Sequence, residues 1–224
     1  MKIGLVIAIE KEIEAFLSEF ENLEVLSEGY FKVYRAKAGK NEVYALKSGW
    51  GHFDAAAATQ FLLTTFKCSA IFNYGVTGAL DPSLKVDDLF IAEKVINYNY
   101  DTSEIDPFLP HQYEGEPSPF MALDAGLIEK AKKAWPELKS AVVASGDAFV
   151  SDKKLKEELF SMGCNLVEME LGAIRRIAAL NGVPVLSVKC ISDTYDGDGS
   201  DFLENVRRSS KKAFVIMKKL LLEL

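Results

Sequence analysis

Short apolar segments that alternate with helical patterns constrain the fold of this chain more than any other feature. The clearest is 183–193, VPVLSVKCISD, which is apolar on both faces of an extended strand. Further strands are expected within residues 2–9, 69–75, 87–96 and 140–146. A strand that is apolar on both faces must be covered on both faces, which is typical of a mostly parallel sheet between layers of helices. The sequence therefore predicts an α/β fold.

The segments between these strands have apolar residues three or four positions apart, which is the helical period. Helices are expected over residues 10–20, 48–66, 124–135 and 152–162, after Val167, and over 202–222. Residues 30–47 instead contain two strand-like runs separated by GKN at 39–41, a pattern that predicts a β-hairpin and adds an antiparallel element. We therefore predict a mixed sheet flanked by helices. No segment has the composition of a linker, so residues 1–224 are expected to form a single domain.

Composition excludes several classes of partner. The net charge of −7 argues against an extended nucleic-acid surface or an anionic membrane. The apolar N-terminal run is too short to span a membrane. Two histidines without ligand spacing argue against a zinc site and against a histidine-based catalytic triad. Three cysteines far apart are typical of reduced thiols in the cytoplasm. These residues are His52, His111, Cys68, Cys164 and Cys190.

Acidic residues and glycines gather where the expected strands end. In α/β sheets, ligands bind beyond the carboxyl ends of the strands. A pocket rich in carboxylates is therefore expected at this edge of the sheet. The segments concerned are Glu10 to Glu12, Ser48-Gly49, Gly75 to Gly78, Gly146-Asp147 and Ser192-Asp193.

The motif VEMELGA, residues 167–173, places Glu168 and Glu170 at the entry of an apolar helix. Acids in a first helical turn are favoured by the helix dipole, which explains both without any function. The alternative is that one of them binds a ligand, and the motif by itself leaves both interpretations open.

Residues 97–120 lack a helical period and contain four of the seven prolines. A segment of this length inside a compact domain is usually a lid or a binding surface. Its aromatic residues favour a lid or a partner contact over a disordered excursion.

Four stretches together carry a family resemblance: AIEKEIEAF, GVTGALDPSLKVDD, SGDAFVSD and VEMELGAIRRIAALNGVPVLSVKCISD. With them, the chain resembles the 5′-methylthioadenosine/S-adenosylhomocysteine nucleosidases of the purine nucleoside phosphorylase superfamily over nearly its whole length. The resemblance implies a three-layer α/β fold around a mixed, partly closed sheet, assembled as a homodimer. It also implies hydrolysis of an N-ribosidic bond to adenine, with water as acceptor and no metal or organic cofactor.

The same resemblance assigns the catalytic acids. Glu12 matches the carboxylate that activates water, and Asp193 matches the acid that protonates the purine at N7. General chemistry requires such a pair, because adenine is a poor leaving group as an anion and the sugar becomes oxocarbenium-like. Asp193 must then hold a proton near neutrality, which burial at the end of an apolar strand can bring about.

The substrate-binding residues follow from the same motifs. Glu170 and Met169 match the ribose-binding pair, and Phe149 matches the ring that stacks on the base. The backbone of Val150 is expected to read the edge of the base, and Gly78 to lie in a loop beneath the sugar. Ser192, in the ISD motif, completes the expected set.

Three positions depart from the family pattern and leave the 5′ substituent open. Val76 replaces a serine, Lys189 replaces an arginine, and Trp50 stands where a smaller aliphatic residue is usual. The substrate can therefore be 5′-methylthioadenosine, S-adenosylhomocysteine or a related 5′-modified adenosine, and the departures also leave adenosine and deoxyadenosine open.

Two other functions compete with hydrolysis. A purine nucleoside phosphorylase needs a basic cradle for phosphate, whereas the first turn here, IEKEIEAF, is acidic. A non-catalytic nucleoside-binding protein needs no carboxylate opposite the purine acid. Glu12, Glu170 and Asp193 together therefore favour an enzyme.

Overall fold

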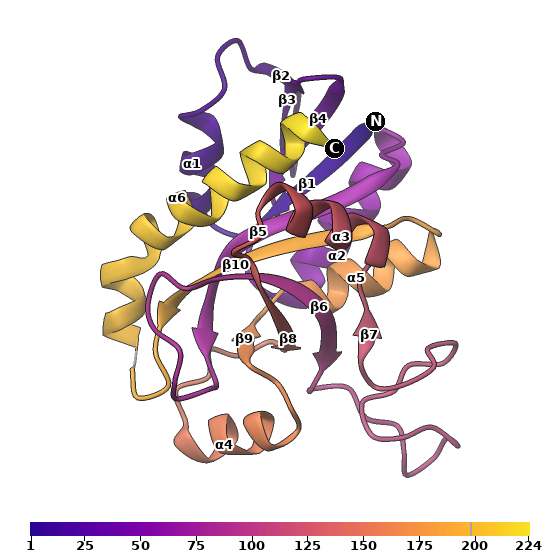
Figure 1. Cartoon of the computed structure of the whole chain (residues 1–224). Coiled ribbons are helices and arrows are strands. Elements are labelled where there is room, and N and C mark those ends of the chain that lie inside the picture. The colour runs from indigo at the N-terminus through magenta and orange to yellow at the C-terminus, as the bar shows by residue number, and fades with distance from the viewer. Residues whose placement is uncertain (198) are drawn as a thin grey trace.

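The computed structural model describes residues 1–197 and 199–224, and its strands and helices alternate along most of the chain (Figure 1). The strands are β1 (Lys2–Ile7), β2 (Glu24–Glu28), β3 (Lys32–Ala38), β4 (Asn41–Lys47), β5 (Ala70–Ala79), β6 (Leu89–Asn97), β7 (Met121–Ala122), β8 (Lys139–Ser145), β9 (Leu166–Glu168) and β10 (Val185–Asp193). The helices are α1 (Glu10–Leu17), α2 (Gly51–Thr65), α3 (Ala125–Ala134), α4 (Lys153–Ser161), α5 (Leu171–Leu180) and α6 (Gly199–Glu223).

The strands form one mixed sheet in the order β10-β6-β8-β9-β5-β1-β4-β3-β2, and β7 pairs with β6. Strand β10 also pairs with β5, so that β5, β10, β6, β8 and β9 close into a ring. The pairs β1–β4, β1–β5, β5–β10, β6–β8 and β8–β9 are parallel. The predicted mixed, partly closed sheet is confirmed.

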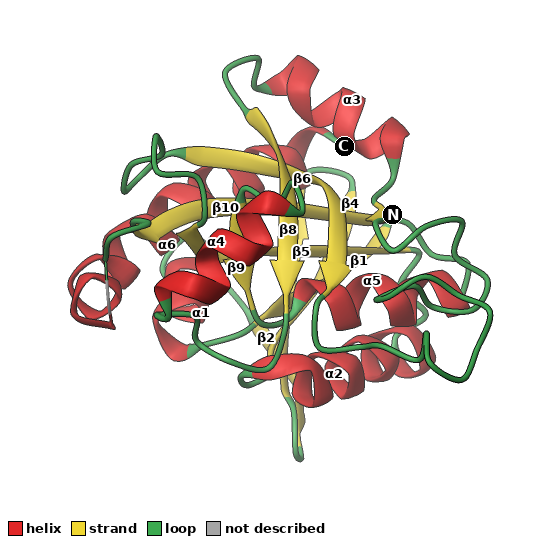
Figure 2. Cartoon of the chain, turned by 90° about the horizontal axis from the view of Figure 1, so that it is seen from below, coloured by secondary structure: helices red, strands yellow, loops and turns green. Residues whose placement is uncertain are grey.

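Helices cover both faces of this sheet, as Figure 2 shows from below. Helices α2 and α5 pack against each other on one side, and α6 contacts α1, α3, β5 and β10 on the other. The core between them contains Phe72 and Tyr74 of β5 and Phe214 of α6, all fully buried. The three-layer prediction is therefore confirmed, and helix α4 lies across the end of the closed part of the sheet (Figure 2).

The sequence missed three short strands, β2, β7 and β9, and ended β5 too early. Gly78 was expected in a loop, but it lies inside β5. The strand continues because Gly78 pairs with Val167 of β9 on one side and with Asp193 of β10 on the other. These pairings are remote in sequence, so the local pattern GVTG does not reveal them.

Three helix ends have residues suited to capping. The side chains of Asp124 and Asp152 accept hydrogen bonds from the backbone N–H groups of Leu127 and Leu155, at 2.8 and 2.9 Å, and so cap α3 and α4. Helix α5 ends before Gly182, whose φ of +65° is a left-handed conformation suited to glycine. Within the described ranges, none of the helices combines the length and the apolarity needed to cross a bilayer.

The segment between β6 and β7 has no helix or strand, yet it is tied to α5. The rings of Tyr100 and Tyr113 stack with centroids 3.9 Å apart. The Glu116 carboxylate pairs with the guanidinium groups of Arg175 and Arg176 at 3.4 and 3.6 Å. These contacts give the segment a defined path over the surface.

Candidate active site

A single cavity at the carboxyl ends of β1 and β10 collects most of the predicted site residues. It has about 400 Å³ of space between atoms, part of it open to solvent, which suits a small ligand. Val150 is not among its lining residues, because its side chain is buried in a separate apolar cluster. The role predicted for the Val150 backbone stays a prediction. The predicted residues that line the cavity are Glu12, Gly78, Phe149, Met169, Glu170, Ser192 and Asp193.

Glu12 lies in the first turn of α1, and its carboxylate turns back towards the sheet. It accepts hydrogen bonds from the backbone N–H groups of Ala8 and Ile9, both at 3.2 Å, and of Val76, at 2.8 Å. Burial raises the pKa of Glu12, and these hydrogen bonds partly oppose that rise. A buried carboxylate with a raised pKa is suited to accept a proton from water near neutral pH.

Two glycines of β5 leave the space that the two acids occupy. A Cβ atom on Gly75 would lie 2.3 Å from Oε1 of Glu12. A Cβ atom on Gly78 would lie 2.7 Å from Oδ2 of Asp193. Both carboxyl groups thus rest directly on the backbone of one strand, and any side chain at either glycine would displace them.

Asp193 is the last residue of β10, and only 3% of it is exposed. The hydroxyl of Ser192 donates a hydrogen bond of 2.7 Å to its Oδ1. Burial raises the pKa of Asp193, as the sequence predicted, and the Ser192 hydrogen bond opposes that rise. The raised pKa favours a protonated carboxyl, which is the form that can donate to a ligand.

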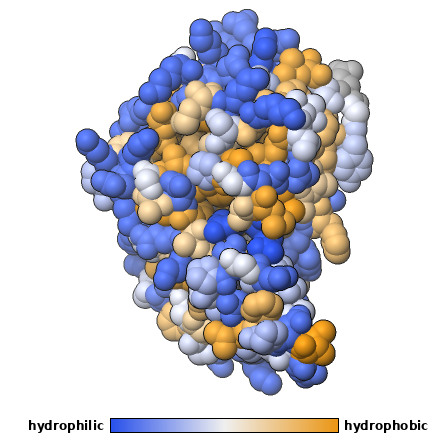
Figure 3. All heavy atoms as spheres, turned by 90° about the vertical axis from the view of Figure 1, so that its right-hand side faces the viewer, coloured by the Kyte–Doolittle hydropathy of each residue, from blue (hydrophilic) through white to orange (hydrophobic). Residues whose placement is uncertain are grey.

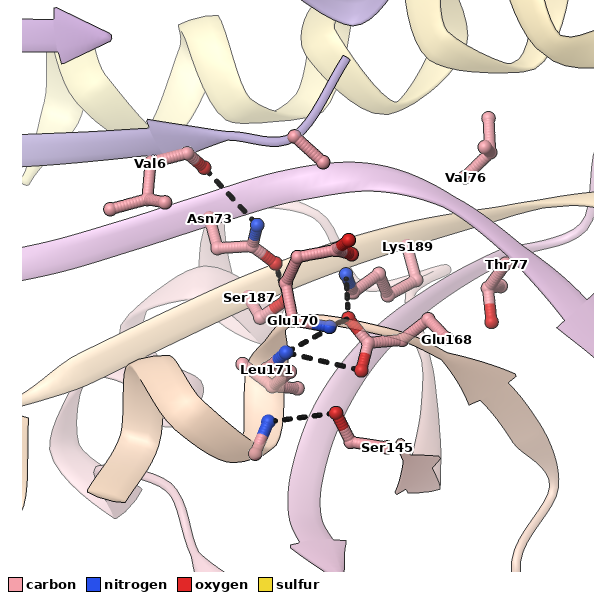
Figure 4. A network of polar contacts seen from close by, with 12 residues as sticks. Val6, Asn73, Val76, Thr77, Ser145, Glu168, Glu170, Leu171, Ser187 and Lys189 are labelled. Carbon is pink, nitrogen blue, oxygen red and sulfur yellow. Dashed lines mark hydrogen bonds and ion pairs between the residues drawn. The ribbon is translucent and has the colours of Figure 1, made fainter. Parts of the chain in front are cut away.

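Glu168 is the helix-start acid of the VEMELGA motif (Figure 4). Its carboxylate accepts hydrogen bonds from the backbone N–H groups of Leu171, at 3.0 and 3.1 Å, and of Glu170, at 3.2 Å. It also forms a buried ion pair of 2.8 Å with the ammonium group of Lys189 on β10. Burial pushes the pKa of Glu168 up, but the Lys189 charge and the hydrogen bonds to the carboxylate together outweigh burial and hold the pKa below its usual range.

Glu170 has the second carboxylate of the motif, and it points into the cavity. Its Oε1 accepts a hydrogen bond of 2.9 Å from the backbone N–H of Gly51. Burial, followed by repulsion from Glu168, raises the pKa of Glu170 to about 8. Hydroxyl groups that donate to this carboxyl would favour its ionised form and would bind to it strongly. Both glutamates of the motif line the cavity, but their environments differ: the Glu168 carboxylate is paired with Lys189, whereas the Glu170 carboxyl accepts a hydrogen bond from the backbone of Gly51.

Three aromatic rings stand at the mouth of the cavity. The rings of Trp50 and Phe149 lie 6.0 and 5.8 Å from that of Phe202, measured between centroids. Phe202 could not be predicted from the sequence, because a phenylalanine at the start of an amphipathic helix is indistinguishable from a packing residue. Its distance from Phe149 along the chain gives no sign that the two rings meet. Together the rings provide flat apolar surfaces suited to a planar base or an apolar substituent.

The cavity is acidic. Its lining includes four carboxyl groups and, over the described ranges, no lysine or arginine; the four are Glu12, Glu168, Glu170 and Asp193. A phosphate dianion is normally held by cationic donors, and the nearby Lys189 is already paired with Glu168. The arrangement therefore suits an uncharged polar ligand better than an inorganic anion.

Comparisons with known proteins agree with this chemistry. A nucleosidase acting on 5′-methylthioadenosine and S-adenosylhomocysteine from Halalkalibacterium halodurans is 32% identical, with 93% of this chain and 94% of that protein aligned. The crystal structure of the Helicobacter pylori nucleosidase of the same name superposes with a TM-score of 0.93 at 28% identity, covering 100% of this chain and 99% of that one. Futalosine hydrolase of Helicobacter pylori gives the same TM-score at 27% identity, covering 100% and 98%. Residues 2–222 match the family described as the phosphorylase superfamily, and the chain belongs to that superfamily.

Proposed function

We propose that this protein hydrolyses the N-ribosidic bond of 5′-methylthioadenosine, S-adenosylhomocysteine or a related 5′-modified adenosine, releasing adenine. The observation that carries the proposal is the placement of two buried acids with raised pKa values, Glu12 and Asp193, against the same strand in one cavity. The similarity to nucleosidases over the full chain supports it. Release of adenine by the purified protein tests it, and a lack of turnover on every adenosine derivative would leave only a nucleoside-binding role.

In the proposed mechanism, Asp193 acts on the leaving base and Glu12 acts on the attacking water. Asp193 donates its proton to N7 of the purine, so that the electron pair of the breaking C1′–N9 bond passes into a neutral base. Positive charge develops on the sugar, and nearby carboxylate charge stabilises it. Glu12 takes a proton from the attacking water, whose oxygen bonds to C1′. Glu170 accepts hydrogen bonds from the ribose hydroxyls, and Phe149 stacks on the departing base.

Water is the proposed acceptor instead of phosphate. A phosphate dianion needs cationic donors, but the described lining contains no lysine or arginine, and the nearby Lys189 is already paired with Glu168. Measuring adenine release in phosphate-free buffer and again with added phosphate separates the two reactions. A strict requirement for phosphate would establish a phosphorylase and overturn the choice of water.

The 5′ group of the substrate is proposed to contact the aromatic mouth. Trp50 is 55% exposed and meets Phe202 there, so the space available to a 5′ substituent is bounded by rings. Relatives of this fold include a futalosine hydrolase and a nucleosidase complexed with an inhibitor that has a prop-2-ynylthio tail. Comparing kcat/KM over a panel of 5′-substituted adenosines determines which group is preferred, and Trp50→Ile should widen the range accepted.

We also propose that the protein is a homodimer formed through the face that bears α5 and the segment 98–120. Apolar residues gather near the middle of this face in Figure 3. Phe53 of α2 is 88% exposed, and Ile105 and Leu109 of the segment are also exposed. A second copy that covers these side chains would remove them from water. Light scattering on the eluting protein tests this, and Phe53→Glu should yield monomers if the face is the interface.

A cytoplasmic location is proposed as well. The three cysteines are buried and unpaired, which is usual for proteins in a reducing compartment. Fractionation of the source cells, followed by detection of the protein, tests this location.

A further inference from the structure

Lys156 of α4 is a buried lysine whose ammonium group holds the segment that follows Asp193. Its Nζ donates hydrogen bonds to the backbone carbonyls of Thr194, Tyr195 and Gly197, at 3.2, 2.8 and 3.0 Å. Only 1% of the residue is exposed. Three backbone carbonyl groups of the turn that follows the proposed acid thus accept hydrogen bonds from one ammonium group.

This contact joins the two segments that border the mouth of the cavity. Helix α4 directly follows the segment with Phe149, and residues 194–197 connect Asp193 to α6, where Phe202 lies. The Thr194 carbonyl also accepts a hydrogen bond of 3.0 Å from the backbone N–H of Gly197, which closes a tight turn. Lys156 therefore fixes the backbone on which the Asp193 carboxyl is oriented.

Two further contacts between the same segments lie on the surface. Lys153 pairs with Asp196 at 3.0 Å, and the hydroxyl of Tyr195 donates to Glu157 at 3.3 Å. Both involve exposed side chains, where pairs of this kind contribute little. They provide matched controls, because they link α4 to the same turn without a buried charge.

The charge of Lys156 acts on Asp193 as well as on the turn. Burial raises the pKa of Asp193, while the hydrogen bond from Ser192 and the positive charge of Lys156 lower it, and Asp201 of α6 raises it. A carboxyl group that holds its proton too firmly is a weak general acid, since proton transfer slows as the donor's pKa rises above the operating pH. The positive charge of Lys156 thus acts on Asp193 in addition to the hydrogen bonds that its ammonium group donates to the turn.

We propose that Lys156 is a positioning residue for N-ribosidic bond cleavage, which orients Asp193 through the turn 194–197 and keeps its carboxyl able to release a proton. The proposal rests on the proposed function, in which Asp193 is the general acid. It assigns two separable effects to one side chain, geometry through the hydrogen bonds and acidity through the charge.

The experiment compares Lys156→Met and Lys156→Gln with Lys153→Met and the unchanged protein. Adenine release is measured from pH 5 to pH 10, and folding is checked by circular dichroism and thermal melting. Lys156→Met removes both effects, so kcat on the plateau should fall about tenfold or more with little change in KM. The basic limb of the profile should move up by roughly half a pH unit. Lys156→Gln keeps donors for the carbonyls, so it should show the same pH displacement with a smaller loss of kcat.

Each result decides for or against the proposal. Lys153→Met should match the unchanged protein in both kcat and pH profile. An unmoved basic limb in both Lys156 variants, or a limb that moves equally in Lys153→Met, would overturn the role in acidity. Failure of Lys156→Gln to fold would assign Lys156 to stability and overturn the proposal too. An unchanged protein without turnover would instead count against the proposed function, so the two failures are distinguishable.

Discussion

Replacing Gly75 by alanine tests directly whether Glu12 is the catalytic base. The added Cβ atom would lie 2.3 Å from Oε1 and 3.0 Å from Cδ of Glu12. Carbon and oxygen atoms in contact stand roughly 3.3 Å apart, so the carboxylate must retreat by about 1 Å. That movement breaks the hydrogen bond of 2.8 Å from the Val76 N–H, which fixes the carboxylate in place.

The expected loss follows from the size of the displacement. A catalytic group misplaced by about 1 Å costs about 100-fold in rate, equivalent to about 2.7 kcal/mol of transition-state stabilisation. We therefore expect Gly75→Ala to lower kcat for adenine release about 100-fold, while KM changes much less. Initial rates with saturating substrate, together with a thermal melt of each variant, provide the measurement.

Two controls separate this effect from general disruption of the sheet. Gly4→Ala on β1 places a Cβ atom 2.7 Å from Cδ1 of Ile71 and touches no acid, so it should lower stability by about 1–3 kcal/mol and leave kcat nearly unchanged. In a Glu12→Gln background, Gly75→Ala should add little further loss, because both changes disable the same group. Additive losses in that double variant would show that Gly75 acts through something other than Glu12 and would refute the reasoning.

Further predictions concern the other charged groups. Asp193→Asn should abolish adenine release but leave binding of a non-hydrolysable adenosine analogue measurable by calorimetry; retained turnover would remove Asp193 as the acid. Lys189→Met leaves the Glu168 carboxylate buried without its partner, so the free energy of unfolding should fall by about 3–5 kcal/mol in urea titrations, and adding Glu168→Gln should restore part of it. Glu170 stays protonated in the folded protein up to a pKa of about 8, but ionises near 4.5 when unfolded, so stability should decrease as pH rises through that window. Glu170→Gln should flatten the decrease, and identical pH dependence in both proteins would contradict the raised pKa.

Most of the elements could be predicted from local pattern, but the closure of the sheet could not. The apolar composition of segment 183–193 predicts a buried strand. Nothing in that segment, however, indicates that β10 pairs with both β5 and β6. Strand β9 has only three residues, too few for any alternation to be visible. The closed ring depends on these long-range pairings, and the physical information that fixes them is the packing of the whole core.

The candidate site also has a part that could be predicted from the sequence and a part that could not. Glu12, Glu170 and Asp193 were identified through motifs, and the structure places them in one cavity. The ion pair of Glu168 with Lys189 and the contacts of Lys156 join residues from separate elements. A lysine in a strand or a helix normally indicates a solvated position, so the sequence gives no reason to expect that either one is buried. The burial of these two lysines therefore could not be predicted from the sequence pattern.

Strand β5 holds the two proposed catalytic acids, Glu12 and Asp193, in one cavity. It lies between β1 and β10 and runs parallel to both, so the start of α1 after β1 and the end of β10 arrive on either side of it. Gly75 and Gly78 are three residues apart on that strand, and each receives one carboxyl group. The spacing of the proposed base and the proposed acid thus follows from the hydrogen-bonded register of the three strands. If Trp50 and Phe202 determine the 5′ preference, as proposed, substitutions at these two positions should change that preference without moving Glu12 or Asp193, since both acids rest on the backbone of β5.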